Sequence, residues 1–211
     1  IIFFHFFFII YIYIYIYMLE FLILFIIIII FLSNNKVVEK FITCLKPIFQ
    51  PEIWNDDKKI KKKNNCYSYA IRELNDTKRK KIHPGTLLGM EKVPKIKGKY
   101  TCKNFIKNLE RDHPKLIKST YSNKCPCNYY KFALFLDNKK RREKKYDYHF
   151  YREDNDGYWS HKPGITKAIN VDASNKLILN PSKADRNYYK KYKKNNYTED
   201  CGYFCIPYKD L

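Results

Sequence analysis

The segment from Ile1 to Leu32 constrains this chain most, because it is apolar almost without interruption. Only His5 and Glu20 break the run, and the polar stretch Ser33-Asn34-Asn35 ends it. A membrane-spanning helix needs about 20 apolar residues, so one span fits this segment. Roughly 150–180 residues are left for a folded domain, which is enough to bury a hydrophobic core.

Two interpretations of the apolar segment stay open. Residues 18–35 begin at Met18 and have the apolar centre and polar end of a secretory signal peptide, without a basic leader or a clear cleavage site. In this interpretation residues 1–17 are translated upstream sequence, because they end in alternating Ile and Tyr, the pattern that ATATAT repeats encode. Alternatively, residues 1–17 belong to a retained membrane anchor. Both interpretations predict entry into the secretory pathway, followed by secretion or membrane anchoring.

The chain is strongly basic, with 41 Lys and Arg against 21 acidic residues and a formal charge of +20. Such a balance favours acidic partners such as nucleic acid, anionic glycans or lipid surfaces. An AT-rich genome produces the same excess of Lys, Asn, Ile, Tyr and Phe, and no nucleic-acid-binding motif is recognisable, so we expect no specific nucleic-acid partner. Residues 36–63, which end in KKIKKK, are interpreted as a solvated basic lead-in. Residues 64–211 are expected to form one domain.

The chain has seven cysteines. In an oxidising compartment an even set pairs, and an odd cysteine is intermolecular or reactive. With Cys66 set aside, the candidates for disulfides are Cys44, Cys102, Cys125, Cys127, Cys201 and Cys205. A zinc site made by the last four is an alternative, but their spacings differ from the usual two-residue gap. We therefore expect neither a metal nor a cofactor.

Helices are expected first along the domain. One helix begins at Cys66, because Tyr67, Ala70, Ile71 and Leu74 recur on one helical face. Asn64 or Asn65 supplies its N-cap, and Asn75-Asp76 ends it. Residues 102–111 predict a second short helix with Phe105, Ile106 and Leu109 on one side.

After residue 114 the apolar period changes to two, which indicates strands. Residues 130–137 form a near-continuous apolar run, typical of a buried strand. Residues 145–152 alternate, so that Asp147, His149 and Tyr151 share one face. A turn at residues 154–157 leads into a return strand at 158–161. Shorter strands are expected at 168–171, 177–179 and 203–207. Helices followed by antiparallel strands predict an α+β domain.

One constellation of residues carries chemistry. Cys66 lies in the first helical turn, where free N–H groups and the helix dipole lower a thiol pKa and favour the nucleophilic thiolate. His149 lies on the polar strand face beside Asp147 and is the candidate base. His161, on the return strand, is the candidate group that orients it. The two imidazoles share a face only if the connecting loop has an odd number of residues, and a three-residue loop, Asn155 to Gly157, places His161 opposite Tyr151.

On the strings NNCYSYAI and DYHFYREDNDGYWSHKPG, the chain resembles the NlpC/P60 and CHAP-like branch of papain-like hydrolases. It resembles still more a group of proteins with the pattern NCYAYA…DYHWYR…DGYWSHKPG…ADR…CGYFC. The resemblance covers about residues 64–207. The sequence departs from the family at His83-Pro84-Gly85-Thr86, where a Gly-Asp-Leu segment is usual, and in the basic residues 60–63, where a Gln is usual.

The resemblance implies a papain-like fold, in which the cysteine helix packs on an antiparallel sheet, and a Cys66–His149–His161 triad. It implies cleavage of amide bonds in peptides or cell-wall peptides. Because the usual Gln is missing, Asn64 or Asn65 is the candidate oxyanion donor. Asp147 and Trp159 are candidate substrate contacts. The alternative function is a catalytically inactive, disulfide-stabilised secreted binding module.

Overall fold

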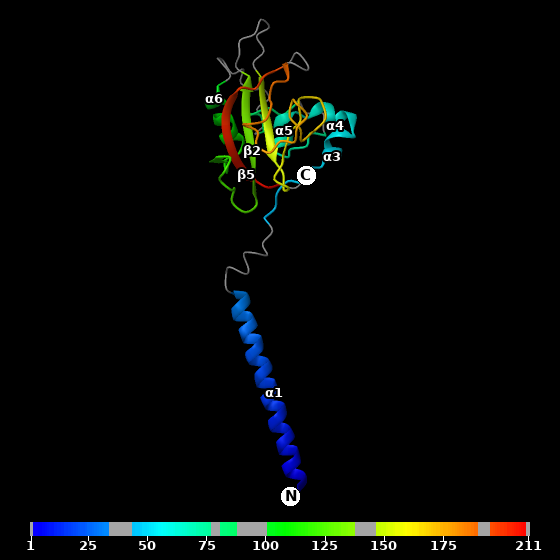
Figure 1. Cartoon of the computed structure of the whole chain (residues 1–211), viewed down its shortest axis with the longest axis vertical. Helices are drawn as coiled ribbons and strands as arrows, with labels where there is room; N and C mark the ends of the chain where they lie inside the picture. Colours follow the sequence, from blue (N-terminus) through cyan, green and yellow to red (C-terminus); the bar gives the residue numbers. More distant parts are fainter. Residues whose placement is uncertain are drawn as a thin grey trace. The chain divides into compact units, whose positions relative to one another are not determined.

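The structure is a computed structural model that describes residues 2–33, 44–76, 81–87, 101–137, 147–189 and 195–209. The chain divides into two compact units, Ile1–Cys44 and Leu45–Leu211. In the first unit, α1 (Ile2–Ser33) is one continuous helix (Figure 1). Its segment Tyr11–Ile30 is long and apolar enough to cross a membrane, a test that signal sequences also pass. The apolar N-terminal segment is therefore a helix, while the choice between signal peptide and anchor stays a prediction.

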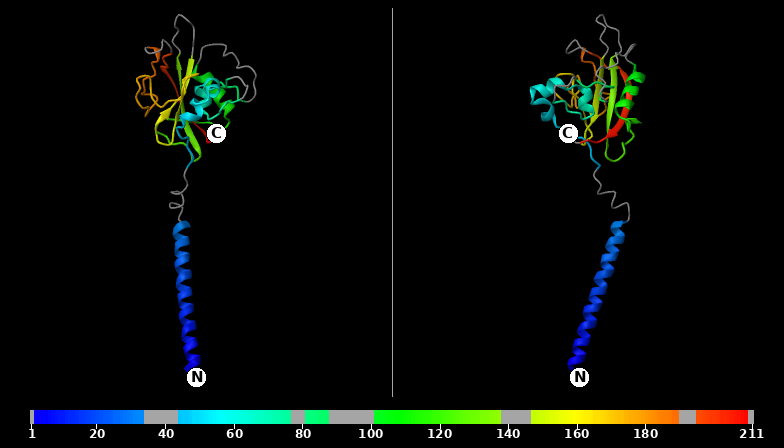
Figure 2. Two further views of the ribbon diagram at one scale, coloured as in Figure 1. Left: turned by 90° about the vertical axis from the view of Figure 1, so that its right-hand side faces the viewer. Right: turned by 180° about the vertical axis from the view of Figure 1, so that it is seen from behind.

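The second unit is built on a five-stranded antiparallel sheet with the strand order β1-β5-β2-β3-β4 (Figure 2). Its strands are β1 (Ile117–Ser119), β2 (Tyr129–Asp137), β3 (Asp147–Glu153), β4 (Trp159–Ser160) and β5 (Glu199–Pro207). Between β4 and β5 the chain makes only isolated bridges in the described residues, including those of Ile169 and Ile178. The predicted α+β class and antiparallel pairing are confirmed.

The helices of this unit are short. They are α3 (Pro51–Asn55), α4 (Lys58–Lys63), α5 (Cys66–Ala70) and α6 (Cys102–Asp112). The predicted helix at 102–111 is confirmed by α6. Part of the expected solvated lead-in is instead folded, because α3 buries Trp54 and α4 is capped by Asp57, whose side chain accepts from Lys59 N and Ile60 N.

The helix that begins at Cys66 is shorter than expected. Its C-cap is Ile71, and Arg72 adopts a left-handed φ of 55°, so that the helix ends at Ala70, four residues before Leu74. The N–H of Glu73 then bonds back to Ser68 O at 2.9 Å, satisfying a carbonyl of the last turn. The predicted apolar face is nonetheless buried as far as Ile71.

The alternating side chains of β2 and β3 feed two hydrophobic clusters. The first core cluster joins α5 and α6 to the sheet through Tyr67, Ala70, Phe105, Leu109, Phe132, Leu134, Phe150 and Phe204. The second core cluster contains Ala133, Phe135, Tyr151, Trp159, Ile178, Tyr188 and Tyr197. Neighbouring residues of β3 thus belong to different clusters, Phe150 to the first and Tyr151 to the second, as their period of two predicts.

Disulfides lock β5 to the rest of the domain. Cys201 is bonded to Cys102 at the start of α6, and Cys205 is bonded to Cys125. Cys44 and Cys127 are also disulfide-bonded. The zinc alternative is therefore wrong, since the sulfurs that it needs are covalently paired. Cys66 is the free cysteine, as the odd count predicted.

Candidate functional site

Cys66 is the first residue of α5, and its backbone is held by a capping box. The Asn65 side chain accepts from Ser68 N, and the Ser68 hydroxyl accepts from Asn65 N. The Cys66 sulfur lies 3.7 Å from Tyr148 O, and the N–H of Phe150 is directed at it. The sulfur therefore contacts the β3 backbone on both sides of His149.

The expectation of a lowered thiol pKa is wrong. Burial raises the pKa of Cys66 to about 12, and the nearby carboxylate of Asp147 raises it further. The N–H groups of Phe150, Tyr67 and Cys66 itself lower the pKa, as expected at a helix start, but by less. Because Cys66 is only 5% exposed, the desolvation of a thiolate outweighs those three donors. Cys66 is consequently a thiol at neutral pH.

His149 and His161 lie together on one face of the hairpin. Arg152 pairs with Ser160 and Glu153 with Trp159, which is the register of the predicted three-residue loop. His149 Nε2 lies 2.7 Å from His161 Nδ1. The sequence prediction that the two imidazoles are diagonal neighbours is confirmed.

The hydrogen bonds of the pair define their tautomers. His161 Nε2 lies 2.9 Å from Val171 O, and a carbonyl only accepts, so this nitrogen carries the proton. Its Nδ1 is then an acceptor, and His149 Nε2 must donate to it. Nδ1 of His149 is left with an unprotonated lone pair. Burial holds the pKa of His149 well below its usual value and lowers that of His161 to about 4, so both rings are neutral at pH 7.

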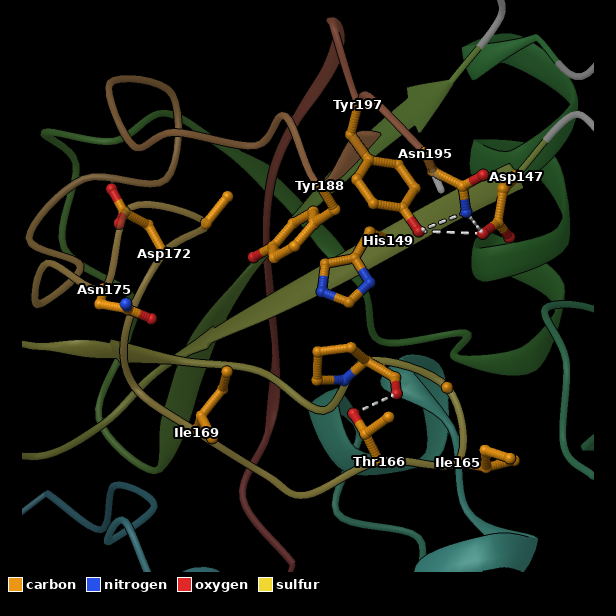
Figure 3. A pocket seen from close by; sticks show the side chains of 13 residues that line it. Asp147, His149, Ile165, Thr166, Ile169, Asp172, Asn175, Tyr188, Asn195 and Tyr197 are labelled. Carbon is orange, nitrogen blue, oxygen red and sulfur yellow. Dashed lines mark hydrogen bonds between the residues drawn. The ribbon is translucent and has the colours of Figure 1, made fainter. Parts of the chain in front are cut away.

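A segment before β5 covers the His149 ring. Tyr197 stacks on it with ring centroids 4.9 Å apart and planes 26° apart. The Tyr197 hydroxyl donates to Asp147 Oδ2 at 2.9 Å, and the Asn195 amide donates to the same oxygen (Figure 3). Burial raises the pKa of Asp147. Asp147 thus positions the aromatic cover of His149.

A cavity of about 440 Å³ opens beside His149. Figure 3 shows its walls coming from β3, the 163–166 turn, the 169–175 segment and the tyrosine-bearing segment before β5. Its lining residues are Asp147, His149, Pro163, Gly164, Ile165, Thr166, Ile169, Asp172, Ala173, Asn175, Tyr188, Asn195 and Tyr197. The cavity lining contains two formally charged side chains, Asp147 and Asp172, and both are acidic although the chain as a whole is basic.

The three other candidate site residues, Asn64, Asn65 and Trp159, have contacts within the fold. The Asn64 side chain exchanges two hydrogen bonds with the backbone of Asn75, and Asn65 caps α5 while donating to Ile82 O. Their role as oxyanion donors stays a prediction. Trp159 is fully buried in the second core cluster and does not line the cavity, which does not support a contact with substrate.

Two buried charged groups near the site were not anticipated. The Lys162 ammonium donates to three carbonyls, those of Lys61, Asn64 and Gly164, at 2.7 to 2.9 Å. Arg152 forms a buried ion pair with Asp154 at 2.6 Å. Both residues lie in the DYHFYREDNDGYWSHKPG string, whose cluster of charged residues in an otherwise apolar hairpin was the available signal.

Comparison with known proteins identifies one relative. The chain is 35% identical over 144 residues to insoluble matrix shell protein 1 of Ruditapes philippinarum, which covers 68% of this chain and 84% of that protein. No protein-family profile and no solved structure matches the chain.

Proposed function

The chain belongs to the family of insoluble matrix shell protein 1, and from this premise we propose that it is a secreted, disulfide-stabilised structural protein of an insoluble extracellular matrix. The relative's name describes a matrix protein that resists dissolution. The observation that carries the proposal is the state of the cysteines, since every cysteine other than Cys66 is disulfide-bonded. Such bonds form and persist in oxidising compartments outside the cytosol.

The resting chemistry of the site supports a structural role. Burial raises the pKa of Cys66 to about 12, so the thiol stays protonated at pH 7. His149 and His161 are neutral as well, so the resting site holds no thiolate–imidazolium pair. Aromatic packing of Tyr197 on His149 and complete pairing of the other cysteines are features of a rigid, durable domain.

Fractionation of the source cells tests this proposal. An antibody against the second unit should detect the chain in the insoluble extracellular fraction, and release should require a denaturant together with a reductant. Peptide mapping after alkylation without reduction should show Cys102–Cys201 and Cys125–Cys205 linked peptides. Recovery from the cytosol with reduced thiols would overturn the proposal.

A second candidate is a cysteine hydrolase of the papain-like kind, resembling the NlpC/P60 branch, with a peptide or cell-wall peptide as substrate. The observation that favours it is the tautomer of His149. An Nε2–H donated to His161 leaves the Nδ1 lone pair free to take a proton from a thiol, while His161 orients the ring. The packing of α5 on β3 agrees with a papain-like arrangement, in which Cys66, His149 and His161 are the triad.

Alkylation kinetics separate the two candidates. For a hydrolase, iodoacetamide should label Cys66 in the native protein at mildly acidic pH, and His149→Ala should abolish the labelling. For a structural protein, Cys66 should resist labelling until the domain is denatured, and His149→Ala should change the native rate little. The disulfide-bonded cysteines serve as the internal control, because they stay unlabelled without reductant.

A further inference from the structure

Helix α4 displays an array of lysines. Five of its six residues, KKIKKK, are Lys, and the side chains of Lys58, Lys59 and Lys62 are exposed. Residues three and four apart are neighbours on a helix, so Lys58 and Lys62 lie side by side, as do Lys59 and Lys62. Like charges at these spacings destabilise a helix. The array is therefore not explained by the stability of α4 itself.

Other parts of the domain hold α4 in its helical form. The Asp57 carboxylate caps its first turn, accepting from Lys59 N and Ile60 N. At its other end, Asn64 Nδ2 donates to Ile60 O, and the buried Lys162 ammonium donates to Lys61 O. A cation at the C-terminal carbonyls is favourable because of the helix dipole. The lysines are thus presented on a fixed scaffold.

The exposed lysines of α4 form no ion pair in the described part of the domain. Some lysines elsewhere do form ion pairs: Lys118 pairs with Glu110 at 2.9 Å, and Lys209 approaches Glu73 at 3.9 Å. No described carboxylate lies within ion-pair distance of Lys58, Lys59 or Lys62. Asp57, the nearest acid in sequence, caps the helix and attracts Lys59 and Lys63 electrostatically, but it forms no ion pair with Lys58, Lys59 or Lys62.

We propose that α4 is a docking surface for an anionic polysaccharide that carries sulfate or carboxylate groups along its length. This inference rests on the proposed extracellular function. Repeated anions along a polymer suit a row of ammonium groups, and because the helix that carries the row is already formed, binding requires no ordering of its backbone. The oxidised cysteines place the domain where glycans, rather than nucleic acids, are the abundant polyanions.

Binding to immobilised heparin tests the surface. The full-length chain, in a nonionic detergent, is compared with the triple variant Lys58→Gln, Lys59→Gln and Lys62→Gln. Glutamine keeps the helix propensity of lysine while removing its charge. The matched control replaces three exposed lysines of the second unit, Lys103, Lys107 and Lys115, in the same way. Both variants lower the net charge equally.

We expect the α4 variant to bind heparin about tenfold more weakly at 0.15 M NaCl and to depend less steeply on salt, as for any polyanion contact that releases counterions. The control variant should stay within about twofold of the parent. Heparin that is both desulfated and carboxyl-reduced carries no anionic groups and should retain neither the parent nor the control. Equal losses in the two variants, or binding that survives the removal of both kinds of anion, would overturn the α4 surface. Recovery from the cytosol would instead overturn the matrix function, whatever the heparin result.

Discussion

His149 donates its Nε2–H to His161 Nδ1 across 2.7 Å, and His161 in turn donates to Val171 O. This chain of hydrogen bonds fixes both rings as neutral tautomers inside the domain. It leaves one imidazole nitrogen, Nδ1 of His149, as an unprotonated acceptor on a ring that lines the cavity. The protonation state of the two histidines therefore determines whether His149 can accept a proton.

The tautomers can be measured directly. At pH 7, ¹⁵N spectra should show His149 with an unprotonated Nδ1 and a protonated Nε2, and His161 with the same pattern. His161→Phe removes the acceptor of the His149 proton, so His149 should then populate both tautomers. A spectrum in which either ring carries two protons at pH 7 would contradict the assignment.

Acid should destabilise the domain through His161. Its pKa is about 4 in the fold against 6.5 for an unperturbed histidine, so below pH 6.5 the unfolded chain binds a proton that the fold rejects. This contribution is fully present above pH 6.5 and is lost as the pH falls toward 4, by about 3 kcal/mol. Urea unfolding at several pH values should show a steeper acid loss for the parent than for His161→Gln. Parallel curves would refute the shift.

Lys162→Met should destabilise the domain by about 3 kcal/mol or more. The substitution keeps the apolar stem but leaves three carbonyl oxygens, at Lys61, Asn64 and Gly164, without the donor that satisfies them. The control is Lys167→Met, at an exposed lysine on the same loop. Chemical denaturation of both variants measures the difference. Similar stabilities of the two variants would mean that the hydrogen bonds of the Lys162 ammonium do not stabilise the domain.

Asp154→Asn should cost about 3–5 kcal/mol, because it leaves the Arg152 guanidinium charged and buried without its anion. Arg152 also donates to Tyr69 OH, so α5 should loosen with it. Asp156→Asn, at an exposed aspartate of the same turn, is the control. Thermal unfolding followed by circular dichroism should separate the two, and a null effect of Asp154→Asn would show that the ion pair is dispensable.

Each disulfide on β5 should contribute strongly to stability. Cys102–Cys201 and Cys125–Cys205 span separations of 99 and 80 residues, for which loop entropy predicts about 4 kcal/mol each. Replacing either pair by serines should lower the free energy of unfolding by that order. Cys66→Ala removes a free buried thiol and should cost less than either pair. A larger loss in the free energy of unfolding for Cys66→Ala than for either serine pair would contradict this prediction.

The spacing of apolar residues predicted those helices and strands that are long enough to show a period. The helix at α6 and the strands β2 and β3 follow from their apolar periods. The hairpin register follows from the three-residue loop, which makes His149 and His161 diagonal neighbours. Short elements were missed: α3, α4 and β1 contain too few residues to show a period, and α5 ends early at the left-handed Arg72.

The sequence alone determined that the chain carries an apolar N-terminal helix, an α+β domain and one cysteine outside the disulfides, because these follow from residue order and number. Tertiary structure decided which cysteines pair, which carbonyls Lys162 satisfies and in which direction the Cys66 pKa moves. Those properties depend on burial and on atoms brought together from distant segments. A helix start favours a thiolate locally, yet the surrounding packing of α5 against β3 removes the water that a thiolate needs.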